Sequence, residues 1–187
     1  PDALRGALRT QLAADRVAPR ILENTARQTL WLLRLGGTNQ ADVELVASVY
    51  YQYRLDDRLL SLLRELAERR GPQLEAAYLK ALFHTGRVED FAREWQRAGA
   101  SLASDAELAL YHAAYVAGWG PREQAAEARR RLAEAMADAK LRLTGARLQL
   151  AVSRQLNDAA GYAAALQRLE EVRAETLLDE VGYWRVL

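Results

Sequence analysis

Hydrophobic residues recur at intervals of three and four along most of the chain, which is the spacing that places them on one face of a helix. The clearest example is the stretch 72–98. Leu74, Tyr78 and Leu82 would share one face of a first helix, and Phe91 and Trp95 one face of a second. A short turn at 85–87 separates them. This stretch predicts an antiparallel helix hairpin, which needs neighbouring helices to bury its apolar faces.

The same pattern continues on both sides and predicts an all-α chain. Prolines, glycines and residues suited to helix N-caps divide it into helices. Pro19 would start the second helix of the first hairpin, and Ser104 with Glu107 would form a capping box at the start of a later helix. The chain is expected to turn around Leu143-Thr144-Gly145 before the helix that follows. The turn positions Arg54, Gly86 and Gly118 are 32 residues apart, a period typical of helix-hairpin repeats. We therefore expect one helical-repeat domain over 1–187, an α-solenoid of about five hairpins. The expected hairpins are roughly 2–35, 40–70, 72–98, 104–141 and 144–173, with a truncated repeat from 179.

Several segments resemble the tetratricopeptide-repeat (TPR) family. The resemblance rests on Val43-x-x-Val46-Ala47-x-x-Tyr50, Phe91-x3-Trp95-x-x-Ala98, Gly71-Pro72 and Trp184-x-x-Leu187. Glu75 and Glu107 depart from the family pattern, which has Trp at those positions. The resemblance implies a right-handed TPR-like superhelix without catalytic residues. The start at Pro1 and the unfinished last repeat lead us to expect a fragment of a longer array, whose adjacent repeats would pack against this segment.

In TPR-like arrays the first helices of successive hairpins line a concave groove that holds partners, so the resemblance implies such a groove here. The predicted groove residues are Glu44, Ser48, Tyr51, Gln52, Lys80, Phe83, His84, His112, Tyr115 and Arg154. Aromatic and polar side chains together suit a protein or peptide partner. The alternative for each residue is packing against the neighbouring repeat, because the groove stripe and the packing stripe adjoin on one helix.

The sequence lacks the residues of the TPR peptide-binding clamp and those of common catalytic and metal-binding motifs. The TPR carboxylate clamp requires Lys or Arg with Asn, but the corresponding positions hold Glu44, Ser48, Ala76, Lys80, Leu108 and His112. The chain contains no cysteine, and its two histidines lack metal-ligand spacing. The glycines form none of the spaced patterns GxxxxGK(S/T), GxGxxG or GxSxG, so the sequence contains no phosphate-binding or nucleophile motif of these types. We expect no enzyme activity, metal or cofactor.

Charge and hydropathy argue against nucleic acid and membranes as partners. Half the residues are hydrophobic and 27% are charged, which is typical of a globular chain. The net charge is only +1, so the chain lacks the strong positive field that would attract nucleic acid or an anionic membrane. No apolar run approaches the roughly 18 residues of a membrane span. The basic run Arg129-Arg130-Arg131 invites a nucleic-acid interpretation, but acidic residues at pairing distances would neutralise it, so we interpret the run and these acidic residues as a solvated helix face. These acidic residues are Glu123, Glu127, Glu134 and Asp138.

We interpret the chain as a scaffold that docks a protein partner on its concave surface. Long degenerate arrays of this kind resemble the periplasmic scaffolds of bacterial exopolysaccharide secretion systems, which recruit enzymes. That resemblance slightly favours the periplasm over the cytoplasm. The first alternative is a carbohydrate-handling helical module in which Tyr51, Phe83 and Tyr115 stack on sugars. An RNA-binding helical repeat ranks last, because of the low net charge.

Overall fold

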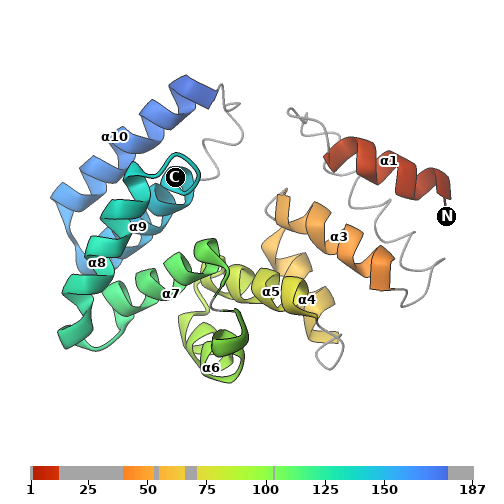
Figure 1. Ribbon diagram of the computed structural model, residues 1–187, viewed down its shortest axis with the longest axis horizontal. Helices are drawn as coiled ribbons and strands as arrows, with labels where there is room; N and C mark the ends of the chain where they lie inside the picture. The colour runs from red at the N-terminus through yellow and green to blue at the C-terminus, as the bar shows by residue number, and fades with distance from the viewer. Residues whose placement is uncertain (1, 13–39, 53–54, 66–70, 103, 177–187) are drawn as a thin grey trace. The chain divides into compact units, whose positions relative to one another are not determined.

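The computed structural model describes residues 2–12, 40–52, 55–65, 71–102 and 104–176. Over those ranges the chain is helical and contains no strand (Figure 1), which confirms the all-α prediction. No helix in the same ranges is both long enough and apolar enough to cross a lipid bilayer. The chain divides into two compact units, Pro1–Arg87 (unit 1) and Val88–Leu187 (unit 2).

Unit 1 contains helices α1 (Asp2–Leu12), α3 (Gln40–Gln52), α4 (Asp56–Glu65) and α5 (Pro72–His84). Helix α1 packs on α3, and α3, α4 and α5 pack on one another. Leu8, Val46, Leu59, Leu63 and Leu79 are fully buried, so the predicted apolar stripes do form the core. The expected helix within 19–35 and the truncated repeat from 179 lie outside the described residues.

An ion pair joins α1 to α3. Arg5 donates from Nε and from a terminal nitrogen to the two carboxylate oxygens of Asp42, at 2.7 and 2.8 Å. The Asp42 carboxylate is 2% exposed. A planar guanidinium facing a carboxylate in this way forms the strongest common type of side-chain hydrogen bond, and it holds the pKa of Asp42 below its usual range.

Helix α5 ends at the predicted turn 85–87. The hydroxyl of Thr85 donates to the carbonyl oxygens of Ala81 and Leu82, at 2.9 and 3.1 Å. Gly86 has a φ of 73°, which is the left-handed conformation that glycine adopts without steric cost. The predicted second limb, α6 (Val88–Ala98), begins directly after the turn.

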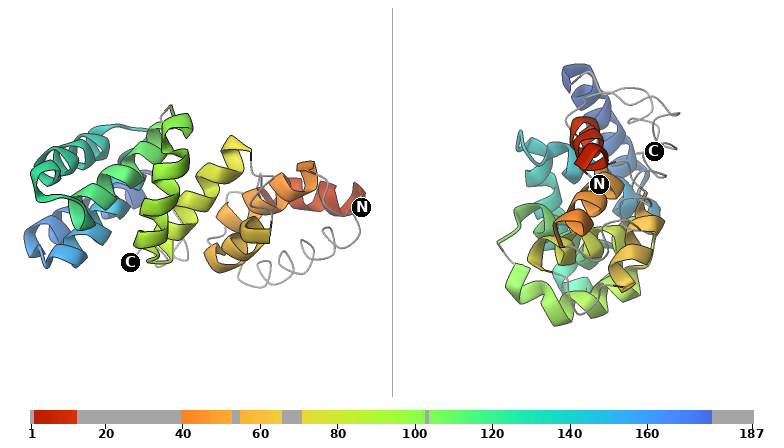
Figure 2. Two further views of the ribbon diagram at one scale, coloured as in Figure 1. Left: turned by 90° about the horizontal axis from the view of Figure 1, so that it is seen from below. Right: turned by 90° about the vertical axis from the view of Figure 1, so that its right-hand side faces the viewer.

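Unit 2 continues with the 3₁₀ helix η2 (Gly99–Leu102), α7 (Ala106–Trp119), α8 (Arg122–Ala137), α9 (Arg142–Leu156) and α10 (Ala159–Thr176). Helix α6 packs on η2 and α7, and α7, α8 and α9 pack on one another. Helices α9 and α10 form a hairpin around Asn157 and Asp158 (Figure 2). Its core contains Ala146, Leu150, Ala165 and Leu169.

Two predicted helix starts in unit 2 are wrong. The sequence pattern assigned the N-cap of α7 to Ser104, but the Asp105 carboxylate accepts the hydrogen bond from the Leu108 backbone N–H. Thr144 and Gly145 were expected in a turn, yet α9 already begins at Arg142. Gly145 is instead a point of close approach, because a Cβ there would lie 3.1 Å from the backbone nitrogen of Met136.

Candidate functional site

The ten predicted groove residues divide between the two units. Unit 1 holds Glu44, Ser48, Tyr51, Gln52, Lys80, Phe83 and His84, and unit 2 holds His112, Tyr115 and Arg154. The side chain of Gln52 lies outside the described residues. Each unit is therefore considered by itself.

In unit 1 the predicted groove residues make contacts within the protein. Lys80 and Phe83 are only 7% and 6% exposed, which leaves little of either side chain for a partner. The Lys80 ammonium lies 5.8 Å from the ring centre of Tyr51, within the range of a cation–π interaction. His84 Nδ1 is 3.6 Å from Asp56 Oδ1, joining the end of α5 to the start of α4.

Two further members of this group lie one helical turn apart on α3. The hydroxyl of Ser48 donates to the backbone carbonyl oxygen of Glu44, at 2.8 Å. Such a bond to the preceding turn is the usual way for a helical serine to satisfy its hydroxyl group. Ser48 is exposed and Glu44 is half-buried, so these two remain more accessible than Lys80 and Phe83.

In unit 2 a set of rings connects α6 to α7. The imidazole of His112 stacks on the Trp95 indole, with ring centres 4.3 Å apart and an interplanar angle of 8°. Phe91 lies 6.0 Å from Trp95 and 5.8 Å from Tyr115, also between ring centres. The His112–Trp95 and Phe91–Trp95 rings are stacked and the Phe91–Tyr115 rings are tilted, at the separations at which aromatic pairs attract one another. His112 and Tyr115 therefore contribute to packing between two helices as well as to the surface.

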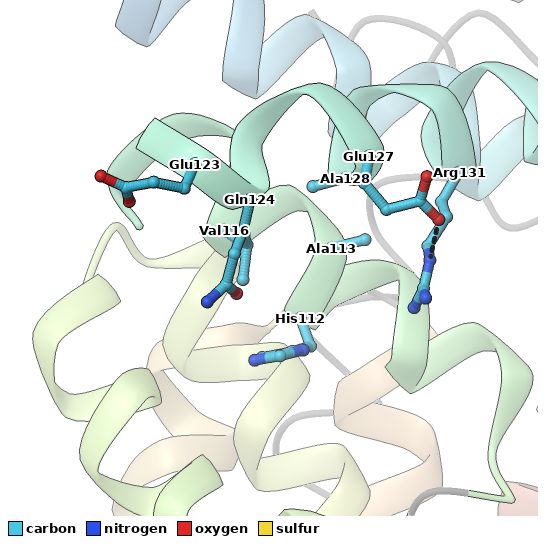
Figure 3. Close-up of a pocket in the computed structure, with 8 residues that line it drawn as sticks. All are labelled: His112, Ala113, Val116, Glu123, Gln124, Glu127, Ala128 and Arg131. Atoms are coloured by element: carbon cyan, nitrogen blue, oxygen red, sulfur yellow. Dashed lines mark hydrogen bonds and ion pairs between the residues drawn. The ribbon is translucent and has the colours of Figure 1, made fainter. Parts of the chain in front are cut away.

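One edge of His112 faces a pocket between α7 and α8 (Figure 3). We call it the α7–α8 pocket, and its volume is about 260 Å³. Helix α7 contributes His112, Ala113 and Val116. Helix α8 contributes Glu123, Gln124, Glu127, Ala128 and Arg131. The space exists because Ala113 and Ala128 present only methyl groups where two helices meet, while longer polar side chains surround the opening.

The charges around this pocket are partly paired. Glu127 accepts hydrogen bonds from Arg130 at 2.8 and 2.9 Å and from Arg131 Nε at 3.2 Å. These bonds lower the pKa of Glu127, so its carboxylate stays ionised and is a weak base. Arg130 also pairs with Glu134. Of the pairings expected for the basic run, those with Glu127 and Glu134 are confirmed.

Whereas the surroundings of Glu127 favour its charged form, those of His112 favour its neutral form. Burial disfavours the charged imidazolium, and the nearby positive charge of Arg131 disfavours it further, so the pKa of His112 is lowered. The imidazole is accordingly neutral at neutral pH. In that form it provides one hydrogen-bond donor and one acceptor next to the apolar floor of the pocket.

Arg154, the last predicted groove residue, lies elsewhere in unit 2. It is exposed and borders an open depression of about 460 Å³ at the α9–α10 turn. The other residues around this depression are Ser153, Asn157, Asp158, Ala159 and Tyr162. The Asp158 carboxylate accepts a hydrogen bond from the Gly161 backbone N–H at 2.9 Å, so it serves as the cap of α10.

The described residues contain no group of three or more histidine, cysteine or acidic side chains placed to hold a metal ion. Comparison of the sequence and fold with known families, curated proteins and solved structures gives no match. The arguments about function that follow therefore rest on this chain's own residues.

Sequence reasoning found only one of the eight residues that line the α7–α8 pocket, His112. Glu123, Glu127 and Arg131 were interpreted as a solvated helix face, and Gln124 was not considered. The available signal was the pair Ala113 and Ala128, small residues on the inward stripes of consecutive helices. Two small residues predict a pocket only when the register of the two helices is known to bring them together.

Proposed function

We propose that this chain is a non-catalytic interaction module that docks a protein partner, with the α7–α8 pocket as its contact site in unit 2. The observation that carries the proposal is the combination of an apolar floor with a polar rim. Protein interfaces place a small apolar contact at the centre and polar groups around it. The pocket is smaller than the roughly 300–1,000 Å³ of sites for small molecules and cofactors, and its size fits one side chain of a partner.

We further propose that the helices continue the TPR-like scheme, as a right-handed solenoid within a longer array. The support is the packing within each unit. In a hairpin repeat, each first helix contacts both its own second helix and the first helix of the next hairpin. Within unit 1 this holds for α1 with α3 and for α3 with α5, and within unit 2 for α7 with α9. A role in bacterial exopolysaccharide export rests on the family resemblance alone.

The carbohydrate alternative receives less support from the same contacts. Stacking on a sugar requires an open aromatic face. Phe83 is almost fully buried, the Tyr51 ring lies beneath Lys80, and Tyr115 packs on Phe91. We therefore retain the protein-docking proposal alone.

The decisive test closes the pocket and leaves the fold intact. Peptides that bind the full chain would be selected from a displayed random library and mapped by NMR chemical shifts. We expect the strongest shifts in α7 and α8. We also expect Gln124→Trp, which covers the opening from an exposed position, to weaken binding about tenfold or more, equivalent to roughly 1.4 kcal/mol.

Gln96→Trp provides the matched control, because Gln96 is also exposed in a helix of unit 2 and does not line the pocket. It should leave binding unchanged. If Gln124→Trp and Gln96→Trp bind the selected peptides equally, or if no peptide shifts α7 and α8, the docking site proposed here is wrong.

A further inference from the structure

The rim of the α7–α8 pocket is asymmetric in charge. At one end Glu127 and Arg131 bond to each other, and Figure 3 shows this pair side by side. At the other end lies Glu123, in the first turn of α8. Among the described residues no ion pair is formed by Glu123. One acidic group is therefore left to interact with a ligand, whereas the basic group of the rim is already engaged.

The floor of the α7–α8 pocket is apolar and suits a hydrocarbon group of the ligand. Ala113, Val116 and Ala128 are nearly buried and offer only hydrocarbon. Burial of apolar surface is the main favourable term available there, at about 25 cal/mol per Å². The Gln124 amide extends from α8 toward His112 (Figure 3), and it supplies a hydrogen-bond donor and an acceptor at the edge of the floor. An amide of this kind suits the backbone of a bound peptide.

From this arrangement, and resting on the docking function proposed above, we propose that the α7–α8 pocket binds a partner segment in which an aliphatic side chain lies next to a lysine or arginine. The aliphatic group occupies the floor formed by Ala113, Val116 and Ala128, and the basic group pairs with Glu123. The partner is a protein segment with a positive charge at this point. Acidic segments are disfavoured, because Glu123 would repel them and Arg131 is held by Glu127.

Peptide selection tests the specificity directly. The full chain, its Glu123→Lys variant and its Glu89→Lys variant would each be used to select from the same displayed library. The unmodified chain should enrich peptides with an aliphatic residue within three positions of lysine or arginine. The Glu123→Lys variant should keep the aliphatic residue but lose the basic one. Affinity for the original consensus peptide should fall about fivefold, the size of one exposed ion pair.

Glu89→Lys is the matched control. Glu89 is an exposed acid in the first turn of α6, so the substitution changes the net charge and the interaction with the helix dipole in the same way as Glu123→Lys. It should enrich the same peptides as the unmodified chain. Circular dichroism and urea unfolding would verify that each variant is folded before selection.

The outcomes separate this inference from the docking function. If the enriched peptides are acidic, lack an aliphatic residue, or do not change with Glu123→Lys, while Gln124→Trp still abolishes their binding, the stated specificity is wrong and the site stands. If the selection yields no peptide sensitive to Gln124→Trp, both are wrong. Binding of a nucleic acid or an oligosaccharide at this pocket in place of peptides would also overturn the inference.

Discussion

His112 has two neighbours that both disfavour its charged form, Trp95 and Arg131. Stacking on Trp95 covers one face of the His112 ring, and Arg131 places a positive charge nearby. The other charged groups that line the same pocket are Glu123 and Glu127, and Glu127 is already engaged by Arg130 and Arg131. The neutral imidazole is therefore the form that the folded protein favours.

This balance predicts a dependence of stability on pH. Because the pKa of His112 in the folded state lies below its ordinary value of 6.5, the unfolded chain binds the proton more readily. The contribution to the free energy of unfolding is complete above about pH 6.5 and is lost as the pH falls through the folded-state pKa. An NMR titration of the His112 ring should give a midpoint below 6.5.

His112→Phe keeps a ring against Trp95 and removes the titration. In urea unfolding, the unmodified protein should lose more stability than this variant between about pH 7 and pH 5. An equal loss in both proteins, or a His112 midpoint at or above the ordinary value, would contradict the prediction.

The Arg5–Asp42 pair provides a second prediction at the scale of single residues. Arg5→Leu would leave the buried Asp42 carboxylate without its guanidinium, which is costly for a charge out of water. We expect unit 1 to lose clearly more stability than in the matched variant Arg9→Leu, since Arg9 is exposed on the same helix. Urea unfolding at neutral pH would measure the difference.

The pH dependence of the same pair has a defined sign. The hydrogen bonds from Arg5 lower the pKa of Asp42 from 3.8, so the pair stabilises the fold above that value and its contribution is lost as the pH falls below it. Asp42→Asn removes the titrating group, and its stability should change less with pH in the acidic range. If the two proteins lose stability in parallel, the pair does not act as described.

The sequence left open whether each predicted groove residue packs within the protein or faces a partner, and burial narrows that choice for Lys80 and Phe83. Lys80 directly follows Leu79 and Phe83 directly follows Leu82, so helical spacing alone places both beside the apolar stripe. In the structure α5 is buried on most of its surface, so the boundary between packing stripe and groove disappears there. Sequence patterns could not reveal this, because it depends on how many neighbours surround a helix.

At the scale of helices and turns, glycine shows most clearly why some boundaries were predictable. The turn pattern predicted the turn after α5, where Gly86 has a positive φ. Gly145 was assigned to a turn on the same grounds, yet it lies inside α9 where that helix approaches α8. A glycine permits both a left-handed turn and close backbone contact, and one sequence does not distinguish them. Ser104 and Asp105 pose the same problem, because both are good N-caps.

Gly86 also supports a quantitative prediction. Alanine at a left-handed position costs about 1–2 kcal/mol, and nothing lies within 4 Å of the added Cβ, so the cost is purely one of backbone conformation. Gly86→Ala should destabilise the protein by about that amount in chemical denaturation. Gly86→Asn should be milder, because asparagine tolerates this conformation better.

Gly6→Ala provides a control of opposite sign. Gly6 lies in α1, is exposed and has free space for a Cβ, so alanine should stabilise by roughly 0.5–1 kcal/mol. A destabilising Gly6→Ala, or a neutral Gly86→Ala, would show that the helix and turn conformations assigned here are wrong.

At the scale of the whole molecule, the hydrophobic spacing correctly predicted an all-helical chain over the residues that the structure describes, but it does not determine how far cooperativity extends along the chain. The expected single domain and the two compact units imply different unfolding behaviour. In a solenoid each repeat contacts only its neighbours, so stability is a sum of local terms and distant parts can unfold separately.

Native-state hydrogen exchange can distinguish these behaviours. Leu59 and Leu169 are buried in unit 1 and unit 2 respectively, and truncating a buried leucine to alanine costs about 2–5 kcal/mol. We expect Leu59→Ala to accelerate exchange in α3, α4 and α5 while the amides of α9 and α10 keep their protection, and Leu169→Ala to give the reverse. If either substitution lowers protection equally throughout 1–187, the chain is one cooperative domain, because only global unfolding would transmit a local loss to every helix.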